Sequence, residues 1–453
     1  MPTSKKPSIY TDRTLILLFI VSFAVSLGMN SIIPIWPLYI MSFGATVLEA
    51  GYVISLSGIA GAVLTGFSGI ISDRIGRRRI ILASIILATI SPLLYMVAGS
   101  WRELILWGTL YGSVFALFMP TRNAWIADLV DPEKRAAAYS FLFLALPIGS
   151  IAGPILGGRI VDGLGWKYLF AHVAAIHGLS LLPMMFIREA GNPPDKQEES
   201  FKDTSLRAGK TKVLALLILL WFILGLGFGM VNPMIPLYLT ERFKTTTTQI
   251  GIFTSIGFGV AGSLAQMFTA RLAGKLGNGK LLLYCCSILP ITFILWPSRT
   301  SYVELLALYM IAMVANTATW SPALSILMDA APASRRGLFS GLFEASITFG
   351  FMVGPTLAGM LWEAWGSNAP IYASAIVFTT SIPTAFLVNR SQRTPQRFEE
   401  EIIQIEKKRL DSLLNENEQL INSCRELIQT NKDLESEIAA LEEKLRVHIV
   451  NRD

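Results

Sequence analysis

Apolar runs of about 20 residues recur along the first 390 of the 453 residues, and each is long enough to cross a bilayer as a helix. Only 15% of the residues are charged, whereas soluble proteins carry about 25%. We therefore predict an all-α integral membrane protein rather than a soluble helical one. The expected spans are 14–42, 47–71, 78–98, 102–127, 138–162, 167–187, 212–240, 248–273, 279–297, 301–329, 338–363 and 368–389.

Lys and Arg are distributed unevenly between the segments that connect these spans. If the N-terminal segment 1–13 is cytoplasmic, the segments on its side carry twenty Lys and Arg and the opposite loops carry five. The positive-inside rule then predicts a protein of the inner (cytoplasmic) membrane with both termini in the cytoplasm. This bias accounts for the net charge of +6, so we expect no nucleic-acid partner. The first run is too long for a signal peptide, and we interpret it as an uncleaved span.

The second half of the chain repeats the first. PIWPLYI at 34–40 returns as PMIPLYL at 233–239, and GSIAGPILGG at 149–158 returns as GFMVGPTLAG at 350–359. Two such halves around a central cavity are the plan of a secondary transporter that alternates its access. We expect twelve transmembrane helices in two pseudo-symmetric six-helix halves. The expected halves are 14–187 and 212–389, joined by a polar cytoplasmic linker at 188–211.

Three motifs resemble those of the major facilitator superfamily. GIISDRIGRRR at 69–79 is similar to its motif A, and AGPILGG at 152–158 is similar to its motif C. LGMNSIIPIWP at 27–37 resembles a first-helix pattern of the twelve-helix drug/proton antiporter branch. The resemblance implies a transporter of small molecules, not an enzyme, that works without a cofactor and is driven by a proton gradient. Because motif C is associated with exporters, it also favours efflux.

Motif A implies a conformational switch between the second and third spans. In the family its aspartate latches the N-terminal half to the start of the eleventh helix, which implies the same role for Asp73. Arg77 and Asp128 are its expected charge partners. The second half has Gly274 where the acid would stand, so we expect a one-sided latch. The expected switch residues are Gly69, Asp73, Arg74, Gly76, Arg77 and Asp128.

Small residues recur every four positions around motif C and its repeat. This spacing puts a flat stripe on one helix face, where a neighbouring backbone can come close, and a proline bends the helix beside it. Two interpretations stay open, namely tight packing alone, or bearing surfaces between the halves (fifth span on eighth, eleventh on second). The residues are Gly149, Gly153, Pro154, Gly157, Gly350, Gly354 and Pro355.

A few polar and aromatic residues interrupt the spans that are expected to surround the cavity. An apolar cavity with few polar groups suits a lipophilic or amphipathic substrate, although each residue also has a plain packing interpretation. The cavity candidates are Asn30, Pro34, Trp36, Pro37, Tyr111, Asn232, Asn316 and Trp320. The three cysteines, Cys285, Cys286 and Cys424, indicate neither a metal site nor a disulfide framework.

Ionisable residues inside the spans are rare and are functional candidates by default. Glu344 is expected to act either as a protonatable coupling group or as a gate or packing acid. Arg122, near the inner end of the fourth span, is expected to join a charge network. The arginine of the family's motif B is missing, because Gly108 and Tyr111 stand at its two polar positions. Uptake or facilitated transport therefore stays open beside export.

Residues 398–449 carry a heptad pattern, with leucine at every d position over about five heptads. We expect a cytoplasmic coiled coil, and three arrangements stay open: a parallel homodimer, a larger bundle or partner helix, and an isolated solvated helix. A membrane scaffold or sensor acting through this tail is the rival function. The seam residues are Leu413, Asn417, Leu420, Cys424, Leu427, Asn431, Leu434 and Leu441.

Overall fold

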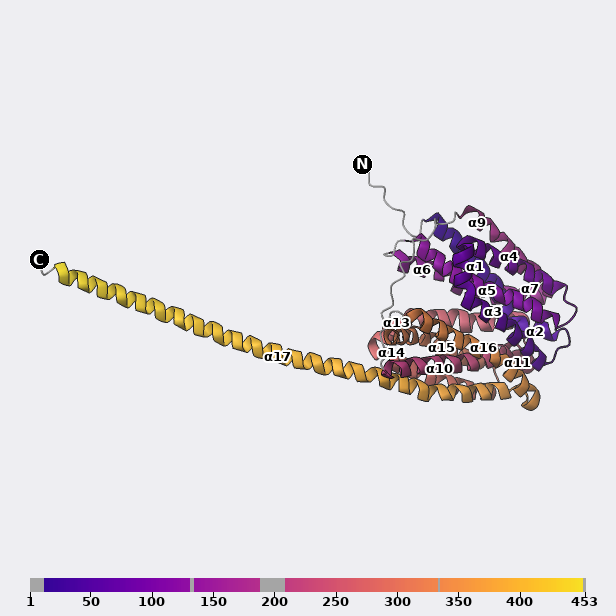
Figure 1. The fold of residues 1–453 in the computed structure, drawn as a ribbon. Helices are drawn as coiled ribbons and strands as arrows, with labels where there is room; N and C mark the ends of the chain where they lie inside the picture. Colours follow the sequence, from indigo (N-terminus) through magenta and orange to yellow (C-terminus); the bar gives the residue numbers. More distant parts are fainter. Residues whose placement is uncertain (1–11, 131–133, 188–207, 333–334, 451–453) are drawn as a thin grey trace. The chain divides into compact units, whose positions relative to one another are not determined.

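The computed structural model describes residues 12–130, 134–187, 208–332 and 335–450, and over these residues the chain contains helices and no strand. It divides into two units, Met1–Arg390 and Ser391–Asp453. The first unit contains all the predicted spans, arranged as two helical bundles (Figure 1).

Within the described residues, twelve helical segments are long and apolar enough to cross a membrane, which confirms the predicted number. In the N-terminal half the helices are α1 (Arg13–Ile32), α2 (Trp36–Met41), α3 (Val47–Ile75), α4 (Arg77–Met96), α5 (Glu103–Leu129), α6 (Arg135–Phe143), α7 (Ala145–Leu164), α8 (Trp166–Leu179) and α9 (Leu181–Phe186). In the C-terminal half they are α10 (Ala208–Val231), α11 (Met234–Phe243), α12 (Thr247–Thr254), the π-helix η4 (Ser255–Ala261), α13 (Gly262–Leu276), α14 (Asn278–Leu295), α15 (Tyr302–Ala330), α16 (Arg336–Trp365) and the first part of α17 (Ala369–Val450).

The first and seventh spans are each broken at their repeated proline pair. α1 ends at Ile32 and continues through a short 3₁₀ turn into α2, while α10 ends at Val231 and continues as α11. Pro34 and Pro233 have no N–H to donate, so the regular helix cannot run through either position. The two halves therefore bend their first helices at equivalent places.

The second and eighth spans begin with the same capping box. Thr46 accepts the N–H of Glu49 before α3, and Thr246 accepts the N–H of Gln249 before α12. In both, the side chain of the third helical residue accepts the threonine N–H in return. The duplication thus extends to the details of these helix starts.

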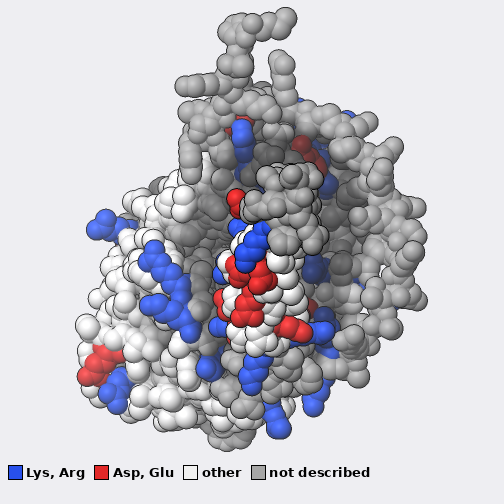
Figure 2. Space-filling view, turned by 90° about the vertical axis from the view of Figure 1, so that its left-hand side faces the viewer, with Lys and Arg blue, Asp and Glu red and all other residues white. Residues whose placement is uncertain are grey.

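The two ends of the first unit differ in charge. The basic end is the end where α1, α4 and α16 begin, and the far end is the end where α2 and α11 end. Figure 2 views the molecule from the left-hand side of Figure 1, where Lys and Arg side chains gather. The Lys and Arg side chains at this end are those of the basic segments that the sequence places on one side.

The glycine stripe of α7 packs against α1 inside its own half. A Cβ on Gly153 would lie 2.8 Å from the Leu27 carbonyl oxygen, and one on Gly157 would meet the Ser31 carbonyl. Gly149 of α7 likewise faces Ser26 of α1. The three glycines therefore pack inside their own half, whereas Pro154 of the same predicted set does face the eighth span, because a Cβ on Gly251 of α12 would meet its carbonyl oxygen.

The equivalent stripe of α16 also faces its own half. A Cβ on Gly350 would meet the backbone of α10 at Leu226, and one on Gly354 would meet it at Gly229. The spacing of four predicts a flat face correctly, but the neighbour that uses the face is the first helix of the same half. The stripes join α7 to α1 and α16 to α10, so they build each half as a body.

Candidate functional site

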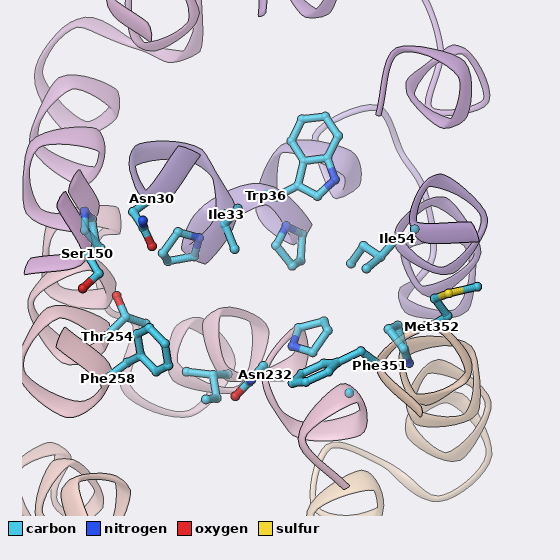
Figure 3. Close-up of a pocket in the computed structure, with 18 of the residues that line it drawn as sticks. Asn30, Ile33, Trp36, Ile54, Ser150, Asn232, Thr254, Phe258, Phe351 and Met352 are labelled. Atoms are coloured by element: carbon cyan, nitrogen blue, oxygen red, sulfur yellow. The ribbon is translucent and has the colours of Figure 1, made fainter. Parts of the chain in front are cut away.

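A cavity of about 470 Å³ lies between the two halves. In Figure 3, Asn30, Ile33 and Trp36 face it from the N-terminal half, and Asn232 and Phe351 face it from the C-terminal half. The breaks after α1 and α10 place the first helices of the two halves on opposite walls of this space. Its volume is within the range of sites that hold drug-sized molecules.

The lining follows the internal duplication. Sixteen of the twenty lining residues form eight pairs whose members are 199 to 201 positions apart. The cavity therefore lies on the pseudo-twofold axis that relates the halves. The pairs are Asn30/Gly229, Ile33/Asn232, Pro34/Pro233, Trp36/Ile235, Ile54/Thr254, Gly58/Phe258, Ser150/Phe351 and Pro154/Pro355.

The members of most pairs differ in chemistry, so the cavity has a symmetric frame and an asymmetric lining. Only the two proline pairs are identical. Asn232 is the equivalent of Ile33, and Thr254 is the equivalent of Ile54, so positions that are apolar in the N-terminal half are polar in the C-terminal half. Among the described residues that line the cavity, none is charged. The site presents a few uncharged polar groups in an apolar surround.

Five of the eight cavity candidates line this space, namely Asn30, Pro34, Trp36, Pro37 and Asn232. The sequence did not single out Tyr309, which lines it from α15.

Three candidates lie elsewhere. Tyr111 lines a second cavity of about 190 Å³, which Trp36 also lines. Asn316 and Trp320 do not belong to the described lining of either cavity. Trp320 instead packs against Trp221, with ring centroids 5.5 Å apart. The two described cavities therefore do not include these α15 residues, and their cavity role stays a prediction.

Trp36 is held in place by an aromatic cluster. Its ring centroid lies 4.6 Å from that of Tyr95 and 5.6 Å from that of Tyr39. The Tyr39 hydroxyl donates a hydrogen bond to the Tyr95 carbonyl oxygen at 2.6 Å. The half-buried indole therefore forms part of the cavity wall, and its equivalent in the other half is the smaller Ile235.

The loop between α3 and α4 has the turn and the ion pair expected of the switch. Gly76 has a φ of 104°, a conformation that favours glycine. Arg77 Nε lies 3.1 Å from an Asp128 carboxylate oxygen, and the same guanidinium donates to the Ser72 hydroxyl at 2.6 Å. Arg74 is exposed. The side chains of Gly69 and Asp73 lie outside the described residues, so the latch itself stays a prediction.

The two coupling candidates lie away from the cavity lining. Arg122 is fully buried, donates to the side-chain oxygen of Asn123 at 3.0 Å, and lies over the ring of Phe143. No described carboxylate pairs with it, so its neighbours are an amide and an aromatic ring rather than a charge network. Glu344 is exposed on α16, and its coupling role stays a prediction.

The two halves contact each other through other faces of α7 and α16, toward the far end. A Cβ on Gly158 would meet the Thr247 carbonyl, and one on Gly359 would lie 2.9 Å from the Val47 carbonyl oxygen. Gly251 meets the Pro154 carbonyl in the same way. Small residues therefore allow close approach between the fifth and eighth spans and between the eleventh and second, on faces next to the predicted stripes.

Two acids at these faces escaped the sequence reasoning. Asp162 accepts hydrogen bonds from Thr247 and Thr248, and Glu363 accepts one from Leu48, each across the boundary between the halves. In the sequence, an acidic residue near the end of a span looks like an ordinary charge at the membrane surface. The signal was present in the repeat, because each acid follows the glycine of its face by four positions.

The tail forms part of α17 and leaves its heptad seam uncovered. Leu413 is 52% exposed and Leu427 is 69% exposed. The coiled coil stays a prediction. The exposed seam residues are Leu413, Asn417, Leu420, Cys424, Leu427, Asn431, Leu434 and Leu441.

The sequence matches the Major Facilitator Superfamily over residues 18–224 and again over residues 217–434. The first match starts in α1 and the second in α10, the first helix of each half. The two matches are thus placed as the internal duplication requires.

Two curated bacterial proteins are similar over most of their length. The quinolone resistance protein NorA of Staphylococcus aureus (strain MSSA476) is 22% identical over 373 residues, which cover 80% of this chain and 92% of that protein. The multidrug resistance protein MdtG of Proteus mirabilis (strain HI4320) is 26% identical over 388 residues, covering 83% and 94%.

Among solved structures, a bacterial homologue of the human lysosomal transporter Spinster, in an inward-facing and unoccupied conformation, has a similar fold. Its TM-score is 0.70 at 15% identity, over 86% of this chain and 98% of that chain. Identity this low supports the fold alone.

Proposed function

The chain belongs to the major facilitator superfamily, and on this premise we propose that it exports a lipophilic or amphipathic small molecule by alternating access. The observation that carries the proposal is the apolar cavity on the pseudo-twofold axis, whose described lining has no charged residue. A sugar or phosphate would need many convergent polar groups, whereas this surface offers a few, including Asn30, Asn232 and Thr254. The two curated resistance proteins support export as the direction.

The contacts between the halves support a transport cycle that starts from a far-end-closed state. The close approaches at Gly158 and Gly359 hold the two halves together near the far end. At the basic end, a Cβ on Gly337 or Gly341 of α16 would find no atom within 4 Å. Because the positive-inside rule predicts that the basic end faces the cytoplasm, the substrate would enter from the cytoplasm or the inner leaflet. Rocking of the halves would then release it on the other side.

The driving force in this proposal is the proton gradient, with Glu344 as the coupling group. Glu344 is exposed on α16, within a span, so it can exchange protons without being sealed in the core. The motif B arginine is absent, and the buried Arg122 is the only cation in the described part of α5. Its burial away from the cavity lining supports a structural role, which leaves Glu344 as the stronger candidate.

We further propose that the tail joins two copies as a parallel coiled coil. In that arrangement Asn417, Cys424 and Asn431 each face their own counterpart, so each asparagine amide finds a polar partner. Leucine at every d position fits a two-stranded seam. Two copies oriented alike in one bilayer would also present their tails in parallel.

The experiment that tests the transport proposal is a flux and resistance assay in a host that lacks its own exporters. We expect expression to lower the accumulation of a lipophilic dye and to raise resistance to lipophilic drugs, and dissipation of the proton gradient to abolish both effects. Increased accumulation would show uptake instead. Movement that persists without the gradient would show facilitated transport.

A further inference from the structure

A carboxylate from each half completes the start of a helix in the other half. Asp162 of α7 accepts the N–H of Thr247 at 3.0 Å and the N–H of Thr248 at 2.8 Å, at the beginning of α12. It also accepts the Thr247 hydroxyl at 2.7 Å. Glu363 of α16 accepts the N–H of Leu48 at 3.0 Å, at the beginning of α3. Both contacts lie at the far end and both cross between the halves.

The two contacts are copies of each other under the internal duplication. The acceptors Asp162 and Glu363 are 201 positions apart, and the donors Thr248 and Leu48 are 200 positions apart. These offsets are the same as those relating the paired residues of the cavity lining. Because the relation exchanges the two halves, it places one acid on each side of a single interface.

The two acids supply hydrogen-bond acceptors that the helix starts lack. The first four N–H groups of a helix have no acceptor within it. At α12, Thr246 and Gln249 satisfy two of these groups locally, and Asp162 satisfies the other two. The start of α12 is therefore complete only while the halves are together. A negative charge at a helix N-terminus is favourable in addition.

We infer that Asp162 and Glu363 are positioning residues that hold the far end of the transporter closed. Opening this end separates each carboxylate from its helix, so the closed state is favoured for as long as the contacts last. Asp162 is the stronger member, because it accepts from three donors and Glu363 accepts from one. The inference rests on the proposed alternating access, and it assigns this control to residues outside motifs A and C.

A distance measurement on the full chain tests the inference. Spin labels on Tyr168→Cys and Val303→Cys occupy exposed positions at the far end of opposite halves, with Cys424→Ser removing the exposed native thiol. We expect Asp162→Ala to raise the population with a long interlabel distance by about two- to fivefold. Adding Glu363→Ala should raise it further. An unchanged distance distribution in the double variant overturns the inference.

The matched control is Glu103→Gln. Glu103 is also a carboxylate at a far-end helix start, but it accepts from Gly99 and Ser100 within its own half. We expect the closed population to stay as in the parent, and an equal opening by this variant would contradict a specific role for Asp162. If Asp162→Ala fails to insert, Asp162→Asn keeps the size and one acceptor oxygen, and should open the far end by a smaller amount.

The readout separates this inference from the proposed function. The distances need neither substrate nor a proton gradient, so unchanged distances overturn the closing role even if transport is robust. Conversely, a parent protein without flux whose distances still respond to Asp162→Ala would overturn export and leave the closing role standing.

Discussion

A carboxylate oxygen of Asp162 lies 2.8 Å from the backbone nitrogen of Thr248, across the boundary between the two halves. One turn earlier in α7, Gly158 meets the backbone of the same helix start, at Thr247. Its neighbour Gly157 faces α1 in its own half. Adjacent glycines of one helix thus belong to two different interfaces, one that builds a half and one that joins the halves.

Substituting these two glycines should give two different defects. Gly157→Ala places a Cβ against the α1 backbone inside the N-terminal half, so we expect a loss of stability of about 1–3 kcal/mol and a lower melting temperature. Gly158→Ala places its Cβ against the α12 backbone, so we expect an opened far end with a smaller change in melting temperature. Thermal denaturation and interlabel distances measure the two effects.

Gly163→Ala is the control for both, because a Cβ at Gly163 on the same helix meets nothing within 4 Å. It should leave the melting temperature and the distances unchanged. The separation of the two interfaces is wrong if Gly157→Ala opens the far end as much as Gly158→Ala does.

Trp36 should determine which molecules the cavity accepts. Its indole lines the cavity, where the equivalent residue of the other half is Ile235, so Trp36→Ala removes a large apolar surface from that wall. Loss of 1.5 kcal/mol or more of apolar contact corresponds to about a tenfold rise in the substrate concentration for half-maximal flux. Transport kinetics with an aromatic dye measure this change.

Trp320→Ala is the matched control, since Trp320 packs on Trp221 outside the described cavity lining. It should leave the half-maximal concentration near the parent value. Equal effects of the two tryptophan substitutions would contradict a specific role for the Trp36 wall.

The fold was predictable because hydrophobic length determines membrane spans, and the repeat located the two halves. The proline pair also predicted cavity residues correctly, since helices 1 and 7 of such a design face the axis. Spacing alone, however, gives the shape of a face and not its partner, which is why the Gly153 and Gly354 stripes were assigned to the wrong neighbour. For the same reason spacing alone does not place Asn316 of α15 at the cavity, whose described lining does not include it.

The ion pair at the basic end should matter in the state in which the far end is open and the basic end is closed. Arg77 pairs with Asp128, and motif A implies that Asp73 closes this end when the far end opens. We expect Asp73→Asn to cut flux severalfold while expression and insertion stay normal. Full activity of this variant would rule out the latch.

Arg77→Gln tests the ion pair separately from the general positive charge of this loop. It removes the 3.1 Å ion pair with Asp128 but leaves the basic run next to it intact. We expect reduced flux with an unchanged topology, as measured by labelling of loop cysteines. The exposed Arg74→Gln is its control and should transport normally.

Glu344 should control the pH dependence of export. If protons drive export through this carboxylate, flux rises as the pH on the proton-entry side falls. Glutamine neither binds nor releases a proton, so Glu344→Gln should give a flux that no longer responds to pH. Glu304→Gln, a carboxylate in the first turn of α15, is the control and should keep the parent profile. A normal pH profile in Glu344→Gln excludes the coupling role.

The tail should crosslink through its own cysteine. Cys424 is exposed at an a position of the heptad pattern, so a parallel dimer places the two thiols opposite each other. Mild oxidation of membranes should then give a disulfide-linked dimer. In the control, Cys424→Ser combined with Asn422→Cys moves the thiol to the outward f position and should crosslink much less. Equal crosslinking from both positions would indicate random collision, and no dimer from Cys424 would contradict the parallel register.

Deleting residues 398–453 distinguishes a transporter from a scaffold. Flux that survives the deletion assigns the tail to assembly, whereas a scaffold would lose its phenotype with the tail.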